Sequence, residues 1–136
     1  VQAAWLAAQH REAEHVRLLH YWLNQRTAMS HQPEPFALSE FEIHRVVAEA
    51  SGNPFLRASS AVLEFGVAVS VVARLDEERQ APPEGLAEPN VQLYEALVRA
   101  IEHGDVDMAA AQMASLIGSD ALFPVTTGTT TRFPAG

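Results

Sequence analysis

The sequence lacks cysteine and lysine, and each absence excludes a class of function. Without cysteine the chain can form no disulfide bond, no thiolate metal site and no cysteine nucleophile. All 9 basic residues are arginines, spread from Arg11 to Arg132, and 17 acidic residues give a formal net charge of -8. Because no basic stripe exists to neutralise a phosphate backbone, we do not expect this segment to bind nucleic acid.

Long apolar stretches are also missing. The longest, residues 61–73, is interrupted by Glu64 and Ser70 and falls short of the roughly 20 residues that a membrane-spanning helix needs. The first residues do not follow the charged-then-apolar plan of a signal peptide. We therefore expect a cytoplasmic protein with no membrane partner, and its 136 residues fit a single domain.

What the sequence does contain favours helices. Alanine, leucine, glutamate, glutamine and arginine dominate, and apolar residues recur at helical spacing between proline and glycine breaks. The pattern predicts an all-α fold with helices at residues 2–27, 36–51 (or from Ser39), 54–80, 89–104 and 105–118. The valine run at 67–72 leaves a strand as an alternative there. Residues 119–136 show no apolar period and are expected to form a flexible tail.

Local signals mark where helices start and stop. Asn53 followed by Pro54 predicts a helix start. The Asn53 side chain can accept hydrogen bonds from the unpaired backbone N–H groups of the first turn, and proline lacks an N–H at a position where that group would have no partner in the helix. Gly104 followed by Asp105 predicts a left-handed helix end and a new cap. The first helix is already under way at residue 1 without a cap, which is typical of a chain cut from a longer one.

The 6 histidines are candidate metal ligands. His10, His15 and His20 are five residues apart, so successive side chains point about 140° away from each other on a helix and cannot converge on one ion. Glu12 and His15 match the i, i+3 pair of di-iron bundles, but those bundles need a second such pair on a facing helix. Solvated or partly packed histidines are the preferred interpretation.

Glu40 and His44 form a different pair. They lie four residues apart on one predicted helix, hence one above the other, at the edge of its apolar stripe. A buried carboxylate and imidazole can satisfy each other, or they can bind a ligand. The two residues alone leave both interpretations open.

The sequence around this pair resembles a known family. Residues 40–56 read EFEIHRVVAEASGNPFL, which resembles the signature D-x-x-F-H-x-x-(I/L)-x-x-A-(S/A)-G-N-P-x-L of the effector-binding domain of FadR-type GntR transcription regulators. A second signature of that domain resembles residues 100–105, AIEHGD, followed by Ala109 and Met113. The resemblance covers most of residues 1–118 and implies an antiparallel helical bundle around a central ligand cavity.

The resemblance also implies where a metal would sit. In many members an acid, a histidine four residues later and two further histidines hold a divalent ion at the cavity floor. Glu40 falls on the acid and His44 on the first histidine, but Tyr94 and Leu116 replace the other two. Because leucine offers no donor and neutral tyrosine a poor one, we expect no tightly held metal and no cofactor, with only weak divalent binding at Glu40 and His44. His44 should then hydrogen-bond Glu40, Tyr94 or the effector.

The implied function is sensing rather than catalysis. A small organic effector, with carboxylates as one candidate class, would bind in a pocket formed by Glu40, His44, Asn53, Tyr94 and Leu116. A second copy would complete a homodimer. DNA contact would come only through an N-terminal winged helix that this sequence does not contain.

Two other functions stay open on the sequence. A small metal-dependent helical-bundle enzyme would use Glu12, His15, Glu40 and His44. A purely structural dimerisation module would fill the cavity with its own side chains. No Ser-His-acid set and no glycine-rich phosphate loop is apparent, and this disfavours an enzyme.

Overall fold

A computed structural model of the chain describes residues 1–60 and 90–119, and these residues fold into helices. The helices are α1 (Gln2–His10), α2 (Ala13–Ala28), α3 (Pro33–Ala50), α5 (Val91–His103) and α6 (Val106–Ser119). Residues 54–60 are also helical, and no strand occurs in the described ranges. The all-α prediction is confirmed. The strand alternative at 67–72 and the tail at 120–136 lie outside the described residues, while Ser119 still belongs to α6.

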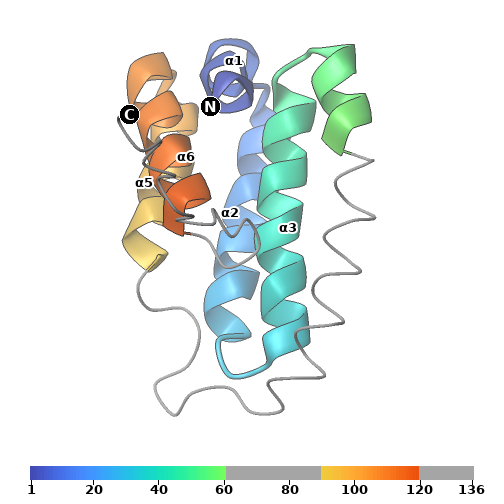
Figure 1. Ribbon diagram of the computed structural model, residues 1–136, viewed down its shortest axis with the longest axis vertical. Coiled ribbons are helices and arrows are strands. Elements are labelled where there is room, and N and C mark those ends of the chain that lie inside the picture. The colour runs from blue at the N-terminus through green and yellow to red at the C-terminus, as the bar shows by residue number, and fades with distance from the viewer. Residues whose placement is uncertain (61–89, 120–136) are drawn as a thin grey trace, which may run out of the picture.

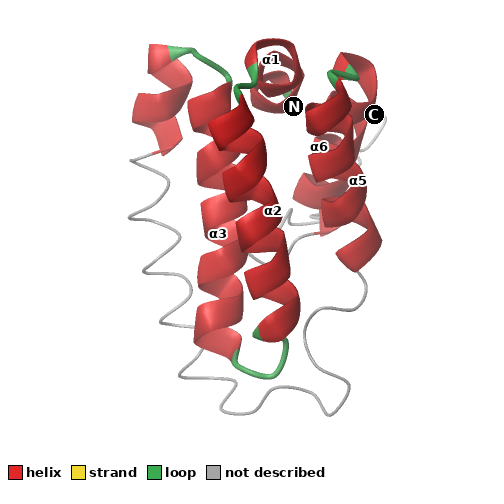
Figure 2. Ribbon diagram, turned by 180° about the vertical axis from the view of Figure 1, so that it is seen from behind, coloured by secondary structure: helices red, strands yellow, loops and turns green. Residues whose placement is uncertain are grey.

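The helices form an antiparallel bundle (Figure 1). α2 and α3 make one hairpin and α5 and α6 make another, and α2 also packs against α5. The short helix α1 crosses the end of the bundle and contacts α3, α5 and α6 (Figure 2). This arrangement places the middle of α3 opposite α5 and α6 (Figure 1).

The prediction of one helix over residues 2–27 is wrong at Arg11 and Glu12. Arg11 has an extended backbone with φ -53° and ψ 142°, and the helical chain restarts at Ala13. Glu12 and His15 form a capping box, in which His15 Nδ1 accepts a hydrogen bond from the Glu12 N–H at 3.1 Å. The Arg11 guanidinium donates to the carbonyls of Ala8, at 3.0 Å, and Glu102, at 3.2 Å. These contacts hold the bend between α1 and α2.

The start of α3 also differs from the prediction. The helix begins at Pro33, ahead of both predicted starts, Phe36 and Ser39. Because the first N–H groups of a helix have no intrahelical partner, proline at these positions breaks no hydrogen bond. The segment 33–35 therefore begins a helix and does not end one.

The other two predicted turns are confirmed. Asn53 Oδ1 accepts from the N–H groups of Phe55, at 2.9 Å, and Leu56, at 3.3 Å, and so caps the helix that starts at Pro54. Gly104 is left-handed with φ 71°, and Asp105 accepts from the Met108 N–H at 3.1 Å. Both turns fix the direction of the helix that follows.

The core lies where the hairpins and α1 meet. Its fully buried members include three alanines of α1, which let that helix approach closely, and the larger side chains Leu19, Ile43, Val46, Val47, Tyr94, Leu97, Ile101 and Leu116. Burying one such aliphatic side chain contributes about 1.5–3 kcal/mol. Within the described ranges, no helix has the length and apolar character required to span a membrane.

Candidate functional site

A buried ion pair links the two helices of the first hairpin. Arg26 of α2 donates to Glu40 of α3, with Nε at 3.0 Å and Nη2 at 2.9 Å from Glu40 Oε1. The side chains are only 1% and 5% exposed. Because a buried charge without a partner is strongly destabilising, each of these residues requires the other.

Two aromatic rings cover the guanidinium of Arg26. Its carbon atom lies 4.7 Å from the ring centroid of Phe36 and 4.4 Å from that of Tyr94. A cation this close to the face of an aromatic ring is stabilised by the quadrupole of the ring. Arg26 is therefore held by Glu40 and by rings from α3 and α5, and it fixes the position of the Tyr94 ring in return.

Tyr94 connects this buried pair to His44. The Tyr94 hydroxyl and His44 Nε2 are 3.1 Å apart, and the two rings meet edge to face with centroids 5.8 Å apart. Tyr94 is fully buried, while His44 is half-buried. The Tyr94 hydroxyl thus orients the His44 imidazole from its buried side, and the other side of the ring lies in a less buried region.

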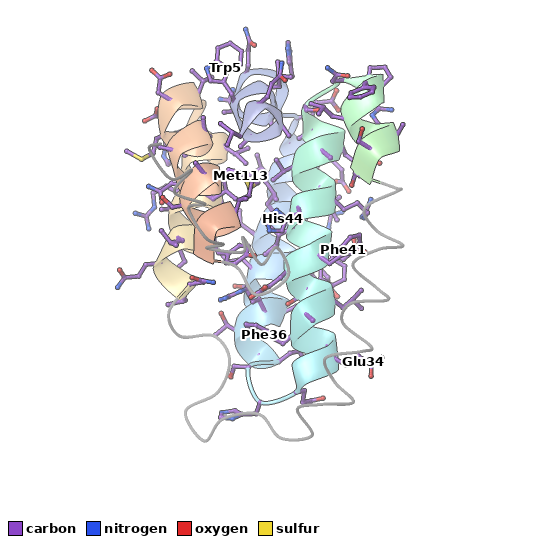
Figure 3. The ribbon with its side chains drawn as sticks, viewed as in Figure 1. Trp5, Glu34, Phe36, Phe41, His44 and Met113 are labelled. Carbon is purple, nitrogen blue, oxygen red and sulfur yellow. The ribbon has the colours of Figure 1, made fainter. Side chains whose placement is uncertain are left out.

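That region is a small apolar pocket between α1, α3, α6 and the helix that starts at Pro54. Its volume is about 180 Å³. His44, Ser59 and Ser60 supply polar groups to its wall, and the apolar lining includes Ala3, Phe41, Val47, Leu56, Met113 and Ile117. Figure 3 shows His44, Phe41 and Met113 on the elements around it. A pocket with mostly apolar walls and few polar groups is typical of small-molecule sites.

The five residues expected at the ligand site take different positions. His44 lines the pocket, and Glu40 and Tyr94 lie in the buried network that begins at His44. Leu116 is buried in the core, whereas Met113 and Ile117 are α6 side chains on the pocket wall. Asn53 caps the helix that carries Leu56, Ser59 and Ser60 into the wall.

The donor set does not fit the metal site that the sequence motif implies. The Glu40 carboxylate is bonded to Arg26, and His44 Nε2 is bonded to the Tyr94 hydroxyl. Leu116 has no donor atom. Among residues 1–60 and 90–119, no three His, Cys, Asp or Glu side chains converge as a metal site. Glu12, His15, Glu40 and His44 therefore do not form the metal centre on which the enzyme alternative depended.

Arg26 and Phe36 are the members of the network that the sequence analysis missed. A signal for Arg26 was present: it follows Leu19 by seven residues and Leu23 by three, so it shares their inward-facing stripe on α2. A cation on such a stripe requires a buried anion, and Glu40 is that anion.

Comparison with known proteins assigns the domain. The family model of the FCD domain matches residues 1–119, which include α1, α2, α3, α5, α6 and every described residue of the network and the pocket. No curated protein matched the sequence. The chain therefore belongs to the FCD domain family, the C-terminal effector-binding regulatory domain of GntR-type transcription regulators.

Proposed function

We propose that this chain is the ligand-sensing and dimerising domain of a GntR regulator of the FadR type, and that it binds a small organic effector beside His44. The observation that carries the proposal is the apolar pocket of about 180 Å³ with His44 on its wall, in a domain of this family. The motif at residues 40–56 supports the FadR type.

Each expected site residue has a role in this proposal. His44 contacts the effector, and Tyr94 orients the imidazole through its hydroxyl. Glu40 holds Arg26 against the Tyr94 ring. Asn53 sets the helix that forms one wall, and Leu116 packs in the core near the α6 wall residues.

The domain would transmit effector binding without catalysing a reaction. It acts as a homodimer in the cytoplasm, and DNA contact belongs to an N-terminal winged helix of the complete regulator. An effector changes DNA binding only to the extent that it prefers one arrangement of the dimer over the other.

A thermal-shift screen of a small-molecule library, performed with a metal chelator present, tests the proposal. An effector at 100 times its dissociation constant should stabilise the fold by about 2.7 kcal/mol. His44→Ala should reduce the shift, and His31→Ala, a change at an exposed histidine, should leave it unchanged. A folded protein that no library compound stabilises would favour the structural dimerisation module.

Sedimentation analysis tests the homodimer. A protein that sediments as a monomer at working concentration would contradict it.

A further inference from the structure

We propose that a second pocket, at the end of the bundle where α1 and α2 meet, binds a small zwitterion, a molecule that carries one ammonium and one carboxylate group as free amino acids do. His10, Glu12 and His15 line this pocket, and the pocket beside His44 uses none of them. The two pockets share no described lining residue. Binding here is therefore a separate property from the effector binding proposed beside His44.

The second pocket lies where several segments of the chain come together. Figure 2 shows the bend between α1 and α2 and the end of α3 at the same end of the bundle. The volume of the pocket is about 450 Å³, within the range of roughly 300–1,000 Å³ that is typical of small-molecule sites. Its described lining includes His10, Glu12, His15, Glu49, Gly52 and Arg57. Polar side chains from α1, α2, α3 and the helix that starts at Pro54 thus face one space.

Charges of both signs line this pocket without neutralising each other. Arg57 supplies a guanidinium, and Glu12 and Glu49 supply carboxylates. Among residues 1–60 and 90–119, no acidic side chain forms an ion pair with Arg57. A zwitterion can bind the guanidinium through its carboxylate and a protein carboxylate through its ammonium group. A ligand of one sign would be attracted by some of these groups and repelled by the others, and no three His, Cys, Asp or Glu side chains in the described ranges converge on a metal ion.

Glu49 is the better partner for the ammonium group of the ligand. The Glu12 carboxylate already accepts the His15 backbone N–H in the capping box, and its charge is compensated by the N-terminus of α2. Glu49 Oε1 lies 3.9 Å from Arg45 Nη1, whereas Arg45 Nε is bonded to Glu42 at 2.7 Å. The Glu49 side chain is 48% exposed. Its carboxylate therefore keeps most of its capacity to bind a cation.

His15 adds a hydrogen-bond donor whose position is fixed. Its Nδ1 accepts the Glu12 N–H at 3.1 Å, so the neutral imidazole carries its proton on Nε2. Arg57 and His15 can then both donate to the carboxylate of the ligand, and the planar guanidinium can form two parallel bonds to it. The capping box at the start of α2 thus orients one of the groups that would hold the zwitterion.

Titration of the 136-residue chain, followed by nuclear magnetic resonance, tests the ligand class with four probes: L-alanine, 4-aminobutyrate, propionate and ethylamine. The first two carry both charges, at a shorter and a longer separation, whereas propionate lacks the ammonium group and ethylamine lacks the carboxylate. We expect at least one zwitterion to shift the signals of His10, His15 and Gly52. Its affinity should exceed those of propionate and ethylamine about tenfold or more, because each of these lacks one charged contact. The signals of His44 should stay in place.

Two variants identify the contacts. Arg57→Gln should weaken binding of the zwitterion about tenfold or more, so that it binds no better than ethylamine. Glu49→Gln should weaken it similarly, so that it binds no better than propionate. Arg99→Gln, at an exposed position of α5 outside the described lining, is the matched control and should leave the affinity unchanged. Because all three residues are exposed, the variants should fold, which thermal unfolding checks.

Other outcomes overturn the inference in distinguishable ways. If propionate or ethylamine binds as tightly as both zwitterions, the ligand class is wrong. If neither zwitterion shifts the signals of His10 and His15, or if binding is unchanged in both Arg57→Gln and Glu49→Gln, the assignment of this pocket is wrong. A zwitterion that shifts the His44 signals alone would bind in the other pocket and would also contradict the assignment. Effector binding beside His44 is tested separately by the library screen, so either site can fail without the other.

Discussion

The guanidinium carbon of Arg26 lies 4.4 Å from the ring centroid of Tyr94. Tyr94 thus separates a buried ion pair from the imidazole that lines the pocket, and it contacts both. Because the Tyr94 ring contacts both groups, a substitution that moves this ring should affect both the stability of the α2–α3 hairpin and the orientation of His44.

The ion pair gives the largest expected effect on stability. Glu40→Gln leaves the Arg26 cation buried without its counter-charge and should lower the free energy of unfolding by about 3–5 kcal/mol, measured by urea denaturation. Glu42→Gln is the control: its partner Arg45 is 34% exposed, and the loss should stay below about 1 kcal/mol. Replacing both partners, Arg26→Met with Glu40→Leu, should recover most of the stability. Equal losses in Glu40→Gln and Glu42→Gln would contradict this account.

The Tyr94 hydroxyl should contribute separately from its ring. Tyr94→Phe removes the bond to His44, keeps the ring over Arg26 and should destabilise the fold by about 0.5–1.5 kcal/mol. Tyr94→Leu removes both contacts and should cost more. Chemical denaturation compares the two variants, and the His44 ring signals should shift in both. A Phe variant as unstable as the Leu variant would show that the ring contact contributes little.

The cap at Asn53 should stabilise the helix that forms one pocket wall. Asn53→Ala leaves the N–H groups of Phe55 and Leu56 without their acceptor and should cost about 1 kcal/mol. Gln32→Ala is a matched control, because Gln32 occupies the N-cap of α3 without a side-chain cap bond. Thermal unfolding of the two variants checks the difference, and equal melting temperatures would refute it.

The two left-handed glycines should differ in their tolerance of alanine. Gly52 has φ 68°, and an added Cβ would meet no atom within 4 Å, so Gly52→Ala should cost only the backbone strain of about 1–2 kcal/mol. At Gly104, with φ 71°, a new Cβ would lie 3.0 Å from Arg11 Nη1, so Gly104→Ala should also disturb the bonds of Arg11 to Ala8 and Glu102. Urea denaturation should therefore show the larger loss for Gly104→Ala, and the reverse order would be inconsistent with the Arg11 contact.

The sequence predicted the features that depend on local chemistry. The cap at Asn53, the left-handed end at Gly104 and the inward stripe of α5 all follow from neighbouring residues, and all are confirmed. The bend at Arg11 was missed because helix-favouring residues continue on both sides, and the Glu12 and His15 side chains that cap α2 resembled a metal-binding pair.

The pairing of Glu40 with Arg26 could not be predicted from neighbouring residues. Its bond to Arg26 joins two helices across a turn, so it depends on how the hairpin packs and not on spacing within one helix. Arg26 shares the apolar stripe of Leu19 and Leu23, which indicates that it is buried but does not identify Glu40 as its partner. The relation of Tyr94 to His44 was one of three predicted alternatives, and only the packing of α5 against the hairpin selects it.

The bend at Arg11 and Glu12 makes α1 a separate rigid rod. Its 9 residues span about 13 Å at 1.5 Å per residue. A difference of about 10° in the direction of this rod would displace its Gln2 end by about 2 Å. Because Ala3 of α1 lines the pocket, the shape of that wall depends on the direction of α1, which the Arg11 bonds to Ala8 and Glu102 set; an unbroken helix over residues 2–27 could not have placed Ala3 there.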